Sequence, residues 1–256
     1  MRDGLEEQGR GPGGGYPVVE LRPKRQVLWA CEGDEDPALE QYRILRTKLV
    51  QRPEPTQVVL IGSPCPDDGK STTAVNLAGV LALRKSVVLV DCDLRNSTMA
   101  ATLGLGEQPG LHSVLRGGAL EQALVRARTL PNLAILPAGK GTSGAAELME
   151  LPGWVAILER LREEFEYVIC DGPPMIGFAD FALLERLADA TLLVVRANHT
   201  NRLAMGSALE SIDPNKFMGL VLNQSEDWFL WRSRSDYGQY DASPVEWAGP
   251  SGKGAV

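Results

Sequence analysis

The stretch from Val58 to Ala78 (VVLIGSPCPDDGKSTTAVNLA) constrains the fold of this chain more than any other. The continuous apolar run from Val58 to Ile61 predicts a strand that is buried on both faces. Turn-forming residues follow, and Gly69-Lys70-Ser71-Thr72 then opens a segment whose apolar residues can line one face of a helix. A strand, a tight loop and a helix that opens with these residues form the sequence context of a phosphate-binding P-loop.

In a P-loop, backbone N–H groups at the helix N-terminus face the phosphates, and the helix dipole favours their negative charge. Lys70 then reaches the β- and γ-phosphates, and the Ser71 hydroxyl binds Mg²⁺. The match departs from the usual pattern because Pro64 stands at the first glycine and because Asp67 and Asp68 add negative charge. On this motif alone, a surface turn that binds nothing remains the alternative.

The composition limits the other classes of function. With 256 residues, 44% of them hydrophobic, the chain can bury one sizeable core. Its net charge of −7 gives no support for a nucleic-acid-binding surface. The four cysteines and two histidines show no metal-ligand spacing, so a zinc site or a histidine-based triad is not expected. Cys92 and Cys170 lie in apolar runs, which indicates small buried residues in a reducing cytosol.

A pair of acids follows the next apolar strand, expected over residues 86–90. Asp91 and Asp93 are two residues apart at its carboxyl end, so their side chains leave the strand side by side. Ligands of open α/β sheets bind at this edge, where two carboxylates can hold Mg²⁺ through water and accept a proton. A helix N-cap explains one Asp, but it poorly explains two followed by Arg95.

A third strand, expected over residues 167–171, also ends in an acid. Asp171 precedes Gly172-Pro173-Pro174, a turn that cannot continue as a helix, and the segment has the form of a Walker B site. Asp171 is therefore expected to hold Mg²⁺ directly or through water. Asp180 is a weaker candidate, since an Asp that begins a helix is more often a cap.

Apolar strands alternate with helices along the whole central part of the chain. Further strands are expected over residues 133–136, 191–195 and 218–222, and helices over residues 37–50, 145–165 and 202–209. This alternation predicts a three-layer α/β/α fold with a mostly parallel central sheet. We expect a flexible leader over residues 1–30, one domain over residues 31–224, and a tail over residues 225–256 that is first aromatic and then flexible.

The first of these helices carries a charged pattern on one face. Asp36 is the expected N-cap and Pro37 the first helical residue. Glu40, Arg43 and Arg46 then recur every third residue, for which a solvated face with one ion pair is the simplest explanation.

At this point most of the chain, from about residue 40 to residue 223, resembles a known family. This family is the bacterial tyrosine autokinases of capsule and exopolysaccharide synthesis, within the MinD/ParA-like P-loop ATPases. Residues 63–72 look like its Walker A motif, residues 88–95 its distinctive second Walker motif, and residues 169–174 its Walker B motif. Residues 40–46 match the helix motif that mediates ring assembly in the family. The partitioning ATPases have a lysine at Cys65, so its absence favours the kinase branch.

The resemblance implies a MinD-like P-loop NTPase fold that uses ATP and Mg²⁺, and it implies roles for individual residues. The implied nucleotide-binding residues are Asp68, Gly69, Lys70, Ser71, Thr72 and Asn223. The implied metal-binding residues are Ser71, Asp91 and Asp171. The implied catalytic residues are Lys70, Asp91 and Asp93, with Asp93 as the base that takes the tyrosine proton. The implied oligomer interface is Glu40, Arg43 and Arg46, and the implied phospho-acceptors are Tyr237 and Tyr240. For Asn223, a turn residue at a strand end is the alternative.

The implied function is an ATP-dependent protein-tyrosine autokinase that regulates the polymerisation or export of capsular polysaccharide or exopolysaccharide. Subunits of a homo-oligomeric ring would phosphorylate one another's C-terminal tyrosines. The chain would be cytoplasmic, and a membrane chain-length-determinant adaptor would recruit it to the inner face of the plasma membrane. No nucleic-acid partner is expected.

Departures from the family pattern leave alternatives open. Family kinases usually end in a dense run of tyrosines, whereas Tyr237 and Tyr240 are the two in this tail. Asp67 is unusual, and Asn96-Ser97 stands where the family has Arg-Pro. The first alternative is an ATP-switched assembly protein without kinase activity. The second is a binding module with a decayed site.

Overall fold

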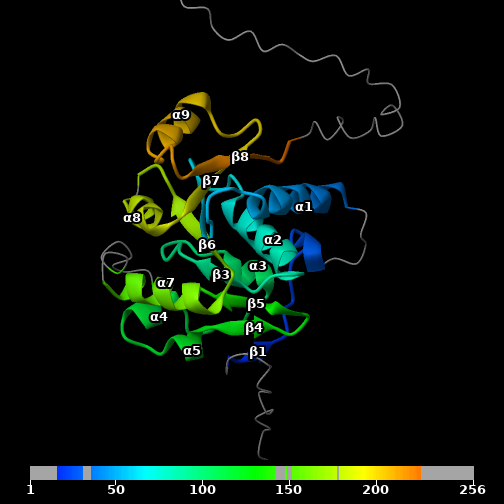
Figure 1. The fold of residues 1–256 in the computed structure, drawn as a ribbon, viewed down its shortest axis with the longest axis vertical. Coiled ribbons are helices and arrows are strands. Elements are labelled where there is room, and N and C mark those ends of the chain that lie inside the picture. Colours follow the sequence, from blue (N-terminus) through cyan, green and yellow to red (C-terminus); the bar gives the residue numbers. More distant parts are fainter. Residues whose placement is uncertain (1–15, 31–35, 142–147, 149–151, 178, 226–256) are drawn as a thin grey trace, which may run out of the picture. The chain divides into compact units, whose positions relative to one another are not determined.

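The computed structural model describes residues 16–30, 36–141, 148, 152–177 and 179–225. Within these residues the strands form one eight-stranded sheet in the order β1-β4-β5-β3-β6-β2-β7-β8 (Figure 1). Neighbouring strands are parallel except for β4 and β5, so the predicted mostly parallel sheet is confirmed. The strands are β1 Val18–Val19, β2 Val58–Ser63, β3 Val87–Asp91, β4 Val125–Ala127, β5 Leu130–Leu136, β6 Tyr167–Pro174, β7 Ala190–Arg196 and β8 Phe217–Asn223.

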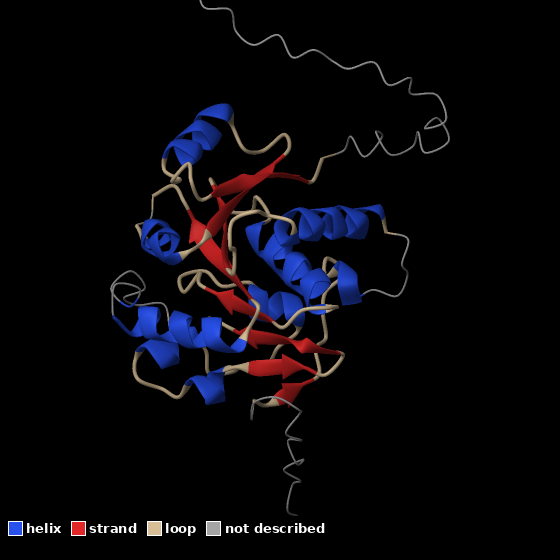
Figure 2. Ribbon diagram, viewed as in Figure 1, coloured by secondary structure: helices blue, strands red, loops and turns tan. Residues whose placement is uncertain are grey.

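Helices cover both faces of the sheet (Figure 2). One face carries α1, α2 and α3, and the other carries α4, α5, α7, α8 and α9. The described helices are α1 Pro37–Val50, α2 Lys70–Ala82, α3 Met99–Leu103, α4 Leu111–Leu115, α5 Leu120–Ala123, α7 Pro152–Glu164, α8 Asp180–Leu187 and α9 Arg202–Glu210, with a 3₁₀ turn η1 at Leu28–Ala30. The predicted three-layer α/β/α architecture is therefore confirmed.

The central strands have apolar residues on both faces because helices cover both faces. Every residue of β2 and of β3 is buried. Val59 and Ile61 of β2 face the core under α1 and α2, while Val58 and Leu60 face the core on the opposite side. This double burial explains why these strands appear in the sequence as continuous apolar runs.

Helix α1 begins where the sequence predicts. The Asp36 side chain caps it by accepting a hydrogen bond from the Ala38 N–H at 2.8 Å, and Pro37 is its first residue. Among the described residues, no helix is long and apolar enough to cross a bilayer. Cys92 and Cys170 are buried among apolar residues, as predicted.

Residues 16–30 belong to the domain and differ in this respect from the expected leader. Strand β1 pairs with β4, and Tyr16, Leu21 and Val27 are buried. The Asn76 side chain in α2 accepts a hydrogen bond from the Leu28 N–H at 2.8 Å. The prediction of a flexible leader thus does not hold for residues 16–30, because β1 pairs with the sheet and several of their apolar side chains pack on the domain.

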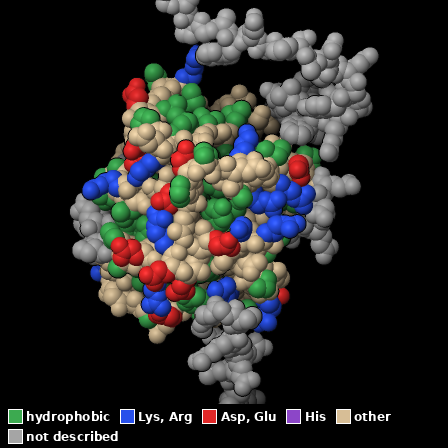
Figure 3. Space-filling model, viewed as in Figure 1, with side chains coloured by type: hydrophobic (Ala, Val, Ile, Leu, Met, Phe, Trp, Pro, Cys, Tyr) green, Lys and Arg blue, Asp and Glu red, His purple; other side chains and the backbone are tan. Residues whose placement is uncertain are grey.

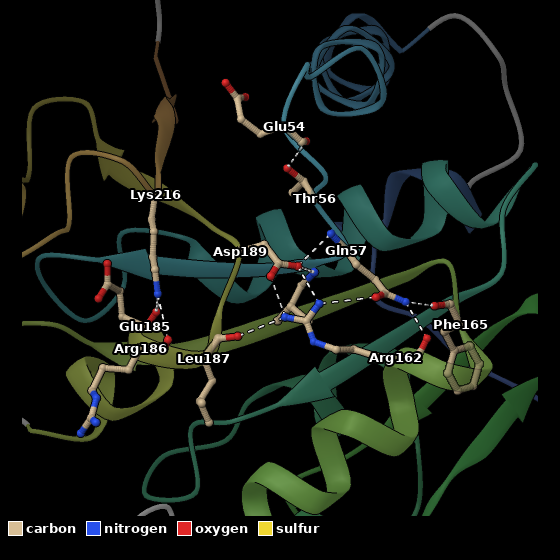
Figure 4. Close-up of polar contacts among 11 residues, drawn as sticks. Glu54, Thr56, Gln57, Arg162, Phe165, Glu185, Arg186, Leu187, Asp189 and Lys216 are labelled. Carbon is tan, nitrogen blue, oxygen red and sulfur yellow. Dashed lines mark hydrogen bonds and ion pairs between the residues drawn. The ribbon is translucent and has the colours of Figure 1, made fainter.

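A polar cluster joins α7 to the amino-terminal ends of β2 and β7 (Figure 4). The Asp189 carboxylate accepts hydrogen bonds from both terminal nitrogens of the Arg162 guanidinium, at 2.8 and 2.6 Å. It also accepts bonds from the backbone N–H groups of Gln57 and Val58, at 3.0 and 2.7 Å. This cluster lies at the amino-terminal ends of the strands, whereas Asp91 lies at the carboxyl end of β3, beside Asp171.

Candidate nucleotide and metal site

The loop between β2 and α2 makes a tight turn that depends on two left-handed residues. Gly69 has φ +98°, and a Cβ on it would lie 1.8 Å from the side-chain nitrogen of Asn223. Asp67 also adopts positive φ, at 63°, and aspartate is one of the few residues besides glycine that do so readily. The unusual Asp67 therefore has a backbone role in the turn.

Lys70 is the first residue of α2, and its ammonium group lies among acids. Its Nζ is 3.1 Å from Oδ2 of Asp93 and 4.0 Å from Oδ1 of Asp171, and it donates a hydrogen bond to the Ser71 hydroxyl at 3.3 Å. Burial lowers the pKa of Lys70, but the charges of Asp171 and Asp93 outweigh it and raise that pKa. The lysine is therefore charged at neutral pH, as a phosphate ligand must be.

Asp91 and Asp171 are paired residues on the adjacent strands β3 and β6. Both are almost fully buried, and burial raises the pKa of each carboxyl group. The negative charge of Asp171 raises the pKa of Asp91 further, while Lys70 opposes the rise at Asp171. The Ser97 hydroxyl donates a hydrogen bond to Asp91. Two acids in this position favour a cation between or beside them.

Asp93 closes the turn that follows β3. Its backbone N–H donates to Oδ1 of Asp91 at 3.2 Å, and its own Oδ1 accepts from the Asn96 N–H at 3.0 Å. The other oxygen, Oδ2, lies toward Lys70. The structure thus brings Lys70, Asp91, Asp93 and Asp171 together beside the carboxyl ends of β2 and β3. Strand β6 does not end at Asp171 as expected, because residues 172–174 continue it along β2 to Pro174.

The donor atoms suit Mg²⁺ that is shared with a phosphate group. Both carboxylate oxygens of Asp171 are buried and accept no hydrogen bond of normal geometry. In the described part of the chain, no group of three or more His, Cys, Asp or Glu side chains could hold a metal on its own. Mg²⁺ is typically bound by one or two carboxylates together with substrate phosphates. Asp91, Asp171 and the Ser71 hydroxyl fit that arrangement.

Asp68 is fixed by three hydrogen bonds. Its Oδ2 accepts from the Cys65 N–H at 2.9 Å, and its Oδ1 accepts from the Thr200 hydroxyl at 2.6 Å. Its backbone carbonyl accepts from the Asn223 side-chain amide at 2.9 Å. The Asn223 side chain thus lies against the P-loop. Thr200 was not predicted, although it follows the carboxyl end of β7 closely enough for the strand-end rule to have drawn attention to it.

The remaining predicted residues lie nearby or elsewhere. The Thr72 carbonyl accepts a hydrogen bond from Asn76, so Thr72 lies in the first turn of α2. Asp180 is buried, does not cap α8, and forms an ion pair at 2.7 Å with Nε of Arg95. The Asp180 carboxylate therefore pairs with an arginine, and the N-cap of α8 is Ala179.

The residues of the expected oligomer interface lie on α1. Arg43 pairs with Glu40 at 3.3 Å, while the Arg46 guanidinium donates to the Val80 carbonyl of α2 at 3.2 Å. Basic side chains gather over this side of the molecule (Figure 3). Tyr237 and Tyr240, the expected phospho-acceptors, lie outside the described residues.

The chain is similar to several characterised proteins. The AAA domain family model matches residues 67–213, more than half of the chain. The tyrosine-protein kinase YwqD of Bacillus subtilis is 34% identical over 78% of this chain and 85% of its own length. The tyrosine-protein kinase ptk of Acinetobacter johnsonii is 28% identical over 79% of this chain, which spans only 28% of that longer relative.

The chain is also similar to solved structures of kinase domains and of MinD proteins. The kinase domain of VpsO superposes with a TM-score of 0.66 at 30% identity, over 73% of this chain and 94% of that domain. The septum site-determining protein MinD of Pyrococcus horikoshii, complexed with Mg-ADP, shares the fold with a TM-score of 0.52 at 22% identity, over 67% and 72% of the two chains.

The P-loop, the acids of two neighbouring strands and the mostly parallel sheet define a P-loop NTPase domain of the MinD-like type. Within that class, the extent of the match to YwqD and to the VpsO kinase domain decides the family. The chain belongs to the bacterial tyrosine-protein kinases.

Proposed function

We propose that this chain is an ATP-dependent protein-tyrosine kinase that transfers the γ-phosphoryl group of ATP to C-terminal tyrosines of a neighbouring subunit. The observation that carries the proposal is the position of the Lys70 ammonium between Asp93 and Asp171 at the start of a P-loop helix. A lysine there can neutralise β- and γ-phosphates, while the acids around it can serve a metal and a proton.

In the transfer step, the tyrosine oxygen forms a bond to the γ-phosphorus as the bond from that phosphorus to the bridging oxygen of ADP breaks. The tyrosine proton goes to Oδ2 of Asp93, which faces Lys70. A positioned base of this kind contributes about 10²–10⁴-fold to a rate. Lys70 stabilises the charge that spreads over the phosphoryl oxygens, and this electrostatic contribution is usually the larger one.

The metal site is part of the same proposal. Ser71, Asp91 and Asp171 are the residues that would hold Mg²⁺, directly or through water, and their oxygens, buried in the case of Asp91 and Asp171, are of the type that this ion prefers. When bound, Mg²⁺ supplies positive charge that neutralises the β- and γ-phosphate oxygens. Asn223 and residues 68–72 would hold the nucleotide itself.

The acceptors, the assembly and the partner follow from the family and remain proposals. Tyr237 and Tyr240 would enter the site of a neighbouring subunit in a ring whose contacts include Glu40, Arg43 and Arg46. Phosphate on the tail would add negative charge and loosen that ring. A membrane adaptor of the chain-length-determinant type would bring the chain to the inner face of the plasma membrane. There the chain would regulate capsular polysaccharide or exopolysaccharide polymerisation or export.

The test is to incubate the purified chain with Mg²⁺ and ATP, with and without the cytoplasmic tail of a candidate adaptor, and to map phosphotyrosine by mass spectrometry. We expect phosphate on Tyr237 or Tyr240, lost in Tyr237→Phe/Tyr240→Phe. Tyr42→Phe, which changes a tyrosine in α1, is the matched control and should leave tail phosphorylation intact. Nucleotide-dependent oligomers without any phosphotyrosine would instead favour the ATP-switched assembly protein.

A further inference from the structure

We propose that Thr200 is a positioning residue for nucleotide binding, because its hydroxyl holds the Asp68 carboxylate in place beneath the P-loop. This inference rests on the proposed function, since it concerns the same nucleotide site. Thr200 itself is not expected to touch the nucleotide, and it acts through Asp68.

The direction of each hydrogen bond at Thr200 is fixed by its neighbours. The Arg196 backbone N–H donates to the Thr200 oxygen at 2.8 Å, so that oxygen is already an acceptor. The hydroxyl proton is therefore directed to Oδ1 of Asp68, 2.6 Å away. A carboxylate can only accept, so this contact requires the donor that threonine or serine supplies.

Asp68 needs this donor because it is a buried acid beside the phosphate site. The residue has no solvent exposure, so water cannot replace a missing partner. Its second oxygen is bonded to the Cys65 N–H within the loop, at 2.9 Å. With both oxygens engaged, the negative charge is stabilised on the side of Cys65 and Thr200. Without Thr200, one oxygen would lack a partner, which is costly for a buried charge.

The main chain of Asp68 is bonded by Asn223, a residue of β8, the strand next to β7. The Asn223 amide binds the Asp68 carbonyl at 2.9 Å, and Asn223 is paired with Arg196 across β8 and β7. The turn after β7 is closed by a bond from the Thr200 N–H to the Arg196 carbonyl, at 3.0 Å. Two neighbouring strand ends thus hold both the side chain and the main chain of one P-loop residue. Because Gly69 and Lys70 follow directly, the position of Asp68 sets the position of the phosphate-binding turn.

The test compares nucleotide affinity in Thr200→Val with that in two other variants. Calorimetry with Mg-ADP should give a dissociation constant about tenfold higher for Thr200→Val, the size of one lost hydrogen bond to a charged group. Thr200→Ser, which keeps the hydroxyl, should stay close to the wild type. Thr191→Val is the matched control, because the Thr191 hydroxyl is buried in β7 without a hydrogen-bond partner.

Further measurements separate positioning from a purely structural role. The KM for ATP should rise in Thr200→Val by about the same factor as the dissociation constant, while kcat changes little. In a double-mutant cycle with Asp68→Asn, the two effects on affinity should be clearly non-additive. A Thr200→Val chain that unfolds more easily but binds Mg-ADP like the wild type would overturn the inference, and so would additive effects. If the wild type itself binds no Mg-ADP, both this inference and the proposed function fail. If affinity changes as expected but no tyrosine is phosphorylated, only the proposed kinase activity fails.

Discussion

Asp91 and Asp171 stand opposite each other in register on the parallel strands β3 and β6, where β3 ends and β6 continues for three more residues to Pro174. Neither carboxyl group is accessible to water, and their proximity raises the pKa of Asp91 beyond the effect of burial. Two buried carboxylates side by side lower the free energy of unfolding, and a cation bound between them offsets this loss. The functional site should therefore be a local source of instability.

The first prediction concerns this cost. Asp171→Asn removes a buried charge whose oxygens accept no normal hydrogen bond, so we expect the free energy of unfolding to rise by roughly 1 kcal/mol at pH 8. Denaturant titration in the presence of a chelator measures it. The same variant should lose Mg²⁺-dependent phosphoryl transfer. A loss of stability in Asp171→Asn would contradict this account of the acid pair.

The second prediction concerns Asp189, an acid whose pKa is lowered, whereas the pKa of Asp171 is raised. Burial alone would raise its pKa, but hydrogen bonds from Arg162 and from the backbone of Val58 and Gln57 hold the pKa of Asp189 below its ordinary value. Asp189→Asn should therefore lower the free energy of unfolding by about 2 kcal/mol at pH 7. Nucleotide binding should be unchanged, because Asp189 lies at the other edge of the sheet.

The pH dependence of this effect has a definite sign. Because the pKa of Asp189 is lowered in the folded chain, its stabilising contribution is complete above the unfolded-state pKa of about 3.9. That contribution is lost as the pH falls through the lower, folded-state pKa. The difference in stability between wild type and Asp189→Asn should thus shrink below about pH 4. Glu210→Gln, an exposed change in α9, is the control, and a difference that grows in acid would refute the assignment.

The third prediction compares the P-loop lysine, Lys70, with Lys85, which follows the other end of α2. Lys70→Met should lower the rate of phosphoryl transfer by at least about 10²-fold, because it removes charge that stabilises the transferring group. Lys85→Met changes a more exposed lysine just beyond the other end of α2, where it pairs with Glu166 at 2.8 Å. Transfer of labelled γ-phosphate should be near the wild-type rate in Lys85→Met. Equal loss in the two variants would mean that Lys70 has no special role.

The fourth prediction tests the packing of residues 16–30. The indole of Trp29 lies against α2 at Gly79, where an added Cβ would come within 2.1 Å of the ring. Gly79→Ala should therefore destabilise the chain by about 1–3 kcal/mol despite the better helix propensity of alanine. Gly206→Ala in α9 meets no atom within 4 Å and should stabilise it slightly.

A second variant makes this prediction specific to Trp29. In a Trp29→Ala background, Gly79→Ala should become neutral or stabilising, since the ring that it displaces is gone. Chemical unfolding of the four chains gives the coupling between the two positions. If Gly79→Ala stabilises the wild type as Gly206→Ala does, Trp29 does not pack at this place.

The sequence predicted which acids lie together where one local rule was enough. A strand that is buried on both faces is a continuous apolar run, and its carboxyl end is where parallel sheets bind ligands. These two rules located Asp91, Asp93 and Asp171 before any contact was known. The same reasoning located β2, β3 and β6–β8, because each of them is long enough to carry a recognisable run.

What the sequence did not predict depends on contacts between distant segments. Thr200 and Asp68 are 132 residues apart, and no local pattern indicates that a hydroxyl will meet that carboxylate. The packing of Trp29 on Gly79 is likewise a tertiary contact, which is why residues 16–30 resembled a leader. The short strands β1 and β4 have too few residues to show any periodicity.

The most direct test of the central claim is a crystal structure of the chain with Mg²⁺ and a non-hydrolysable ATP analogue. We predict the β- and γ-phosphates within hydrogen-bond distance of Lys70 Nζ, the metal at the Ser71 hydroxyl and near Asp91 and Asp171, and Asp93 facing the γ-phosphate. A nucleotide bound at any other place, or a metal remote from Asp91 and Asp171, would contradict the account.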